Sequence, residues 1–200
     1  YNAIQLNFAN VFRNAEITGG ALSRMYHMGG AYNYESFTEP ATANGLWFST
    51  YSELFPDVEA LLTLTEARGL DGHTASVKIL KAYSLMALVD NLNDVPLTDA
   101  GQGTDVVSPT RDGGQMVYGE AIKLLDEAIT LLASTTAAGP ANDFYYGGDL
   151  TKWSALANTL KLRAAMTTRL IDPSGAAAMV NSVVSSGNFI SSASGDFQAE

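Results

Sequence analysis

The chain has 200 residues, of which 46% are hydrophobic and 10% aromatic, so it can form one sizeable packed domain. Its net charge of −10, from 11 basic and 21 acidic residues, argues against binding to nucleic acid or to anionic lipid. Cysteine is absent, which excludes disulfides, thiolate zinc sites and cysteine nucleophiles, and no apolar run reaches the roughly 18 residues that a membrane span needs.

The first part of the chain predicts one helix followed by a long loop. Apolar residues at helical spacing predict a helix over residues 1–18, which the pair Gly19-Gly20 would end. Residues 19–45 are rich in glycine and aromatic residues and predict an irregular segment. Loops of this length are uncommon and often functional.

The next stretch predicts a helical hairpin. A helix is expected over residues 46–68, where Pro56 either kinks it or starts a second segment. Asp71 or Thr74 can then cap a helix over about residues 75–90. The two helices would pack as an antiparallel pair.

A second hairpin is expected after a long connection over residues 91–111. Asp112 and Gln115 have the spacing of a capping box for a helix over about 113–133, whose apolar stripe is well defined. Its partner is an amphipathic helix that begins near Trp153, and Asp149 or Thr151 can cap its first turn. A shorter helix over about 173–186 follows, with Asp172 as its cap and Pro173 as its first residue.

These patterns predict an all-α fold of tetratricopeptide-like helical hairpins with long irregular loops, although neither hairpin carries a clean tetratricopeptide consensus. We divide the chain into residues 1–45, an N-terminal helix with a loop-rich aromatic segment, and residues 46–200, a helical-repeat region.

No catalytic pattern is present in the sequence. His27 and His73 are far apart and form no metal-binding motif, so a surface or hydrogen-bonded role is expected for each. The acidic loop around Asp90, Asp94, Asp99 and Asp105 has oxygen ligands suited to calcium, but it lacks the other features of an EF-hand, and turn chemistry is the alternative. No carboxylate pair stands out for glycoside hydrolysis. We therefore predict no enzyme activity, no cofactor and no metal.

Two blocks of the sequence match a known pair of motifs. Residues 143–163 read DFYYGGDLTKWSALANTLKLR and are similar to the signature GD-x-x-KW…AN-S-LKLR. Upstream, residues 94–132 are similar to the block GDVP…P-x-x-D…IY…LDEA. In both blocks the chain resembles the SusD/RagB family, the glycan-binding outer-membrane lipoproteins of Bacteroidetes. Asn93 and Thr159 depart mildly from these patterns, where Gly and Ser are common. Trp153 and Asp149 belong to the signature, and we interpret both as structural.

The resemblance implies non-catalytic capture of an oligosaccharide or polysaccharide at the cell surface and its delivery to a TonB-dependent, SusC-like outer-membrane transporter. It also implies a surface-exposed lipoprotein whose lipidated Cys lies upstream of Tyr1, and further sequence beyond Glu200. The alternative is a helical-repeat scaffold that binds a peptide or protein. A glycan binder would present two or more coplanar rings flanked by amides, whereas a scaffold would present a continuous polar groove.

The candidate binding residues lie between Tyr26 and Tyr51. Sugar rings pack on aromatic faces, and their hydroxyls bind planar polar side chains. This segment supplies both kinds, and the resemblance places part of the glycan site near the first hairpin. The candidates are Trp47, Tyr32, Tyr34 and Asn44. The alternative is that these rings pack onto the helices beneath them.

Overall fold

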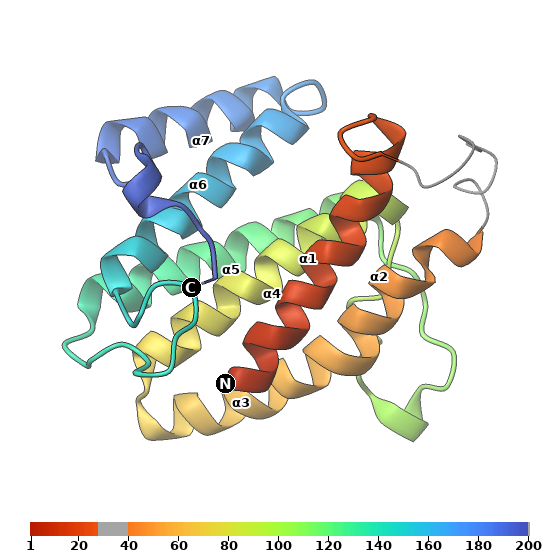
Figure 1. The fold of residues 1–200 in the computed structure, drawn as a ribbon, viewed down its shortest axis with the longest axis horizontal. Helices are drawn as coiled ribbons and strands as arrows, with labels where there is room; N and C mark the ends of the chain where they lie inside the picture. Colours follow the sequence, from red (N-terminus) through yellow and green to blue (C-terminus); the bar gives the residue numbers. More distant parts are fainter. Residues whose placement is uncertain (28–39, 200) are drawn as a thin grey trace.

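A computed structural model of the chain describes residues 1–27 and 40–199. Within these residues every regular element is a helix, which confirms the predicted all-α class (Figure 1). The longer helices are α1 (Asn2–Leu22), α3 (Phe55–Arg68), α4 (Asp71–Leu92), α5 (Gly114–Ser134), α6 (Leu150–Thr168) and α7 (Pro173–Ser186). The shorter elements are η2 (Pro40–Ala43), α2 (Asn44–Phe48), the π-helical η3 (Ser49–Leu54), η4 (Gly103–Asp105) and η5 (Ala193–Gly195).

Helix α4 lies at the centre of the fold. It packs most extensively against α5 and also contacts α1, α3 and α6. Because neighbours surround it, α4 carries apolar or small residues on nearly all sides, and most residues from Gly72 to Leu88 are buried. Apolar residues are therefore less confined to one side of α4 than they are in α5, which keeps one face in solvent.

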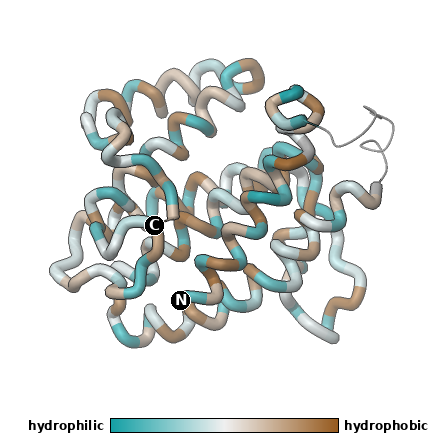
Figure 2. The backbone as a smooth tube through the Cα atoms, in the orientation of Figure 1, coloured by the Kyte–Doolittle hydropathy of each residue, from teal (hydrophilic) through white to brown (hydrophobic). Residues whose placement is uncertain are grey.

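The helices are arranged as antiparallel neighbours, as the sequence predicts. The pairs α3–α4 and α5–α6 form the two hairpins, and α7 returns along α6 (Figure 1). Helix α1 lies across α4 and η3, and its buried residues belong to the same hydrophobic core as Trp153. Hydrophobic and hydrophilic residues alternate along the helices in Figure 2, as expected where each helix buries one face.

Helix α1 is longer than predicted, because it runs through Gly19-Gly20 and ends at Leu22. Gly20 serves packing rather than termination. The ring of Tyr26 folds back onto Gly20, where a Cβ atom would collide with it. The carbonyl of Gly20 also accepts the backbone N–H groups of Met25 and Tyr26.

The predicted helix over residues 46–68 is three segments rather than one. It begins earlier, at Asn44, and its α-helical course is interrupted by η3. Pro56 lies in the first turn of α3, so it starts a segment, which is one of the two predicted roles. The segment predicted as a loop, residues 19–45, is thus helical at its two ends, where α1 enters it and η2 begins.

Two predicted helix caps are confirmed. The carboxylate of Asp149 accepts hydrogen bonds from the backbone N–H groups of Thr151 and Lys152, at 2.9 and 3.2 Å. Asp172 accepts from the N–H of Gly175 at 2.9 Å. Both caps satisfy N–H groups that have no partner within their helix.

The predicted cap of α4 is wrong. The residue before the helix is Leu70, and no side chain caps its first turn. The hydroxyl of Thr74 instead donates to the hydroxyl of Thr65 at 2.8 Å, deep between α3 and α4. A side chain that could cap its own helix is here used to join two helices, because the hairpin buries it.

Candidate functional site

Three aromatic rings form a row along one side of α2, η3 and α3. Trp47 and Tyr51 have ring centroids 4.7 Å apart, and Tyr51 and Phe55 have centroids 5.4 Å apart. The rings are not coplanar, because the first pair is inclined at 46° and the second at 83°. The row therefore offers one exposed indole face with two rings behind it, and not the flat platform expected of a glycan binder.

The middle of this row lies in the π-helical element η3. Both four-residue steps, Trp47 to Tyr51 and Tyr51 to Phe55, pass mainly through it. The turn is supported locally, because Thr50 Oγ1 donates to the carbonyl of Leu46 at 2.7 Å and Ser49 Oγ donates to that of Gly45 at 2.8 Å. Such bonds to the preceding turn are known to bend helices.

The inner end of the row opens into a cavity of about 300 Å³ between α3, α4 and the loop after α4. Its lining is mainly apolar, with one ion pair, and comprises Tyr51, Phe55, Pro56, Glu59, Lys81, Leu97, Ala100 and Gly101. The volume is at the lower end of the roughly 300–1,000 Å³ range of small-molecule sites.

The ion pair in this lining joins α3 to α4. Lys81 Nζ lies 2.5 Å from Glu59 Oε1 and 5.9 Å from the centroid of the Phe55 ring. The side chain of Lys81 is 17% exposed, whereas that of Glu59 is 58% exposed. The ammonium group is therefore held close to an apolar wall while the carboxylate faces solvent.

Tyr51 fixes the loop that forms the opposite wall. Its hydroxyl donates a 2.6 Å hydrogen bond to the carbonyl of Pro96, which lies 45 residues further along the chain. Burial, and then the nearby charge of Asp112, raise the pKa of Tyr51 well above its ordinary value of 10, so the hydroxyl keeps its proton.

Asp112 holds the same loop, and the predicted capping box is wrong. The Asp112 carboxylate accepts the backbone N–H groups of Leu97 and Thr98, both at 2.8 Å. Its backbone also forms an isolated antiparallel bridge with Val95. The first N–H of α5, that of Gly114, is instead satisfied by the carboxylate of Asp94 at 3.1 Å.

The acidic loop that could suit calcium is used for other contacts. Asp90 pairs with Arg163 at 3.2 Å and accepts the hydroxyl of Tyr118 at 2.6 Å. Asp99 accepts the hydroxyl and the backbone N–H of Thr110. Among the described residues, no group of three or more acidic or histidine side chains is placed to hold a metal ion. These contacts join segments that are far apart in the sequence, so they differ from the local turn chemistry of the alternative interpretation.

Of the four predicted binding residues, two can be placed. Trp47 is 40% exposed at the outer end of the row, and Asn44 is exposed one turn before it. Tyr32 and Tyr34 lie outside the described residues. The prediction did not include Tyr51, Phe55 and Lys81. The four-residue spacing of Trp47, Tyr51 and Phe55 indicates that these rings share one side of a helix, whereas no sequence pattern points to Lys81.

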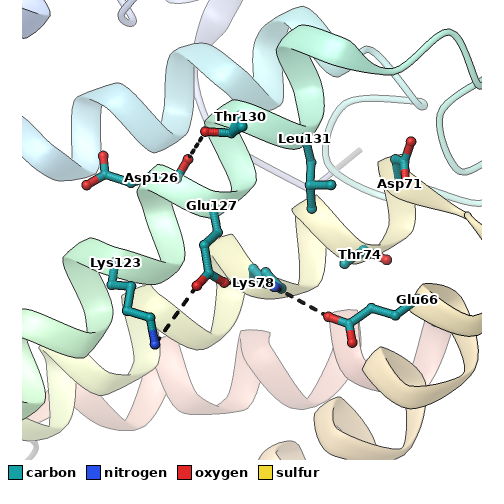
Figure 3. A pocket seen from close by; sticks show the side chains of 9 residues that line it. All are labelled: Glu66, Asp71, Thr74, Lys78, Lys123, Asp126, Glu127, Thr130 and Leu131. Carbon is teal, nitrogen blue, oxygen red and sulfur yellow. Dashed lines mark hydrogen bonds and ion pairs between the residues drawn. The ribbon is translucent and has the colours of Figure 1, made fainter.

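A second, larger hollow of about 600 Å³ lies between the end of α3, α4 and α5. Figure 3 shows the ammonium of Lys78 between two carboxylates, with Glu127 at 2.8 Å and Glu66 at 3.4 Å. Asp126, on the same helix as Glu127, pairs with Lys161 of α6 at 2.6 Å. These charged groups join four helices to one another, so this hollow is a structural ion-pair network, whereas the aromatic row is the better ligand site.

Within the described residues, the fold is a set of helical hairpins, and a partly exposed aromatic row lies beside a cavity on α2, η3 and α3. The family model described as starch-binding and associating with the outer membrane matches residues 2–197, and the chain belongs to this SusD-like family. The resemblance drawn from the two sequence blocks is thereby confirmed. No curated protein matches the chain. Among the described helices, none has the length and apolar character needed to cross a bilayer.

Solved structures share the fold. A chitin-binding protein is 25% identical with a TM-score of 0.79, over 98% of this chain and 45% of that protein. A SusD/RagB-family protein from Bacteroides thetaiotaomicron is 26% identical with a TM-score of 0.73, over 98% of this chain and 44% of that protein. A SusD-like protein from Bacteroidetes is 22% identical with a TM-score of 0.79, over all of this chain and 38% of that protein. The chain thus spans less than half the length of these relatives.

Proposed function

We propose that this chain binds an oligosaccharide or polysaccharide without changing it, at the outer face of the outer membrane. The bound glycan is then delivered to a TonB-dependent, SusC-like transporter, and the protein is attached to the membrane by a lipid anchor. The observation that carries the proposal is the exposed ring of Trp47 beside an apolar cavity, on a chain of the SusD-like family.

The environment of Trp47 supports binding rather than packing. Trp153, the other tryptophan, is completely buried, whereas Trp47 keeps 40% of its surface in solvent. Asn44 lies three residues earlier on the same short helix, so both side chains are on neighbouring positions of one face. An indole face with an amide beside it suits a pyranose ring, whose C–H face is apolar and whose rim is hydroxylated.

The composition of the cavity supports binding without hydrolysis. Glycosidases use two carboxyl groups about 5–9.5 Å apart across the scissile bond. Of the described residues that line this cavity, Glu59 is the only acid, and it is paired with Lys81. The description of the family as starch-binding and outer-membrane-associated points the same way, as does a chitin-binding relative at 25% identity.

Affinity gel electrophoresis against a panel of polysaccharides tests the proposal, using the full-length protein and two variants. Trp47→Ala should weaken binding to the recognised polysaccharide by about tenfold or more, because it removes the stacking face. Phe48→Ala is the matched control, since Phe48 is an exposed ring on the same helix outside the row. Equal losses from both variants would place the site elsewhere.

A failure to retain any polysaccharide would contradict glycan capture and favour the alternative, a helical-repeat scaffold for a peptide or protein. Delivery is tested separately by co-purification of the tagged protein with a SusC-like transporter from outer membranes. Reproducible hydrolysis of a bound glycan by the pure protein would contradict the non-catalytic part of the proposal.

A further inference from the structure

The cavity beside the aromatic row is lined mainly by apolar side chains. Six of its eight lining residues present carbon surface from aromatic rings, proline, leucine, alanine or glycine. A hydroxyl that enters such a space loses its water and finds few partners, which is unfavourable. The site therefore suits a glycan that has an apolar substituent.

The charged part of the lining consists of one hydrogen-bond donor, the Lys81 ammonium, beside one acceptor, the Glu59 carboxylate. Lys81 Nζ and Glu59 Oε1 are 2.5 Å apart, and the ammonium lies 5.9 Å from the centroid of the Phe55 ring. Because Lys81 is 17% exposed and Glu59 is 58% exposed, the donor is near the apolar wall and the acceptor is nearer to solvent.

An acetamido group has the matching set of features. It carries a methyl group for the apolar wall, a carbonyl oxygen that accepts from Lys81, and an N–H that donates to Glu59. A sugar carboxylate would instead meet Glu59 and a chain of net charge −10, and a free sugar ammonium would meet Lys81. The neutral acetamido group avoids both repulsions.

We infer that this cavity receives the acetamido group of an N-acetylated amino sugar, in a glycan whose sugar ring packs on Trp47. The two contacts can act together because the Tyr51 ring lines the cavity and also lies 4.7 Å from the Trp47 ring, centroid to centroid. The volume of about 300 Å³ is large enough for an acetamido group. This inference rests on the proposed glycan binding and names its substrate class.

Isothermal titration of the full-length protein with three β-1,4-linked hexasaccharides tests the inference. The probes are the N-acetylglucosamine hexamer, the glucose hexamer and the fully deacetylated glucosamine hexamer, which differ at the 2-position. The acetylated hexamer should bind about tenfold or more tightly than either of the others, since the site would lose both a methyl contact and hydrogen bonds.

Two variants place that preference in the cavity. Ala100→Leu fills the cavity and should reduce the preference to near equality, and Lys81→Met should weaken the acetylated hexamer selectively by removing the donor. Ala137→Leu, an exposed loop position away from the cavity, is the matched control and should keep the preference. Circular dichroism melting curves establish that each variant is folded.

The outcomes separate the two proposals. Binding that depends on Trp47 but does not distinguish the three hexamers overturns the inference and leaves glycan capture standing. A preference that survives in Ala100→Leu also overturns it, because recognition would then lie outside the cavity. An absence of binding to these hexamers and to the polysaccharide panel overturns both.

Discussion

The indole Nε1 of Trp153 donates a 2.7 Å hydrogen bond to Oδ2 of Asp143, and both side chains are buried. The same carboxylate accepts the backbone N–H groups of Tyr145 and Gly148, each at 3.0 Å. Gly147 and Gly148 have φ angles of 59° and 86°, which suit glycine. The carboxylate therefore folds the turn that brings Asp149 to the start of α6, which explains why these signature residues act as one structural unit.

We predict that Trp153→Phe destabilises the protein by about 2–4 kcal/mol, because it leaves a buried carboxylate without one donor and creates a cavity. Denaturant unfolding measures this change in the free energy of unfolding. Trp47→Phe is the matched control, since Trp47 is 40% exposed, and it should change stability by less than about 0.5 kcal/mol. Similar losses from both changes would contradict the structural role of Trp153.

Tyr51→Phe should keep the ring contacts but release the loop wall of the cavity. The change removes the hydrogen bond to the carbonyl of Pro96, which is worth about 1 kcal/mol. Faster amide hydrogen exchange is expected at Val95 and Asp112, whose backbone bridge closes this loop. Tyr118→Phe removes a different hydroxyl, bonded to Asp90, and should leave exchange in the loop unchanged.

The contribution of Asp112 should depend on pH. Hydrogen bonds from the backbone N–H groups of Thr98 and Leu97 lower the pKa of Asp112 below its ordinary value of 3.8. A group whose pKa is lower in the folded state stabilises the protein above its unfolded-state pKa, and this stabilisation is lost as pH falls through the folded pKa.

The measurement is the melting temperature of Asp112→Asn relative to wild type across the acid range. The gap should be widest near neutral pH and should close as pH falls below 3.8. Asp105→Asn changes an exposed carboxylate of the same loop and should show a smaller gap at neutral pH. A gap that stays constant with pH would rule out the ionised carboxylate as the source.

The two carboxylates around Lys78 should be interchangeable. Burial acts to lower the pKa of Lys78, but Glu127 and Glu66 together raise it above 10.5. Both carboxylates contact the ammonium (Figure 3), and we expect either one alone to hold it. Glu66→Gln and Glu127→Gln should therefore each cost less than about 1 kcal/mol, because both acids are partly exposed.

The double variant should cost about 1 kcal/mol more than the sum of the single changes, since Lys78 would then have lost both partners. Chemical denaturation of the four proteins in this cycle measures the coupling. Additive losses would mean that solvent, and not the second carboxylate, compensates for each single change.

Local chemistry explains what could be predicted from the sequence. Asp149 and Asp172 are predictable as caps because a cap bonds only to N–H groups two or three residues away, within its own helix start. Asp112 has the same local signal, yet its carboxylate accepts N–H groups 14 and 15 residues earlier in the chain. A cap prediction holds only where no distant segment competes for the same oxygen atoms.

In the candidate site, too, some features follow from local sequence and others from contacts between distant segments. The sequence by itself determined the helices, the signature turn around Trp153 and the aromatic character of the segment that contains Trp47. Only the tertiary structure decided that Tyr51 and Phe55 continue inward from Trp47 and meet Lys81 of α4 and Leu97 of the following loop. Helix formation and capping depend on neighbours within a few residues, whereas a cavity needs walls from distant segments, which only packing brings together.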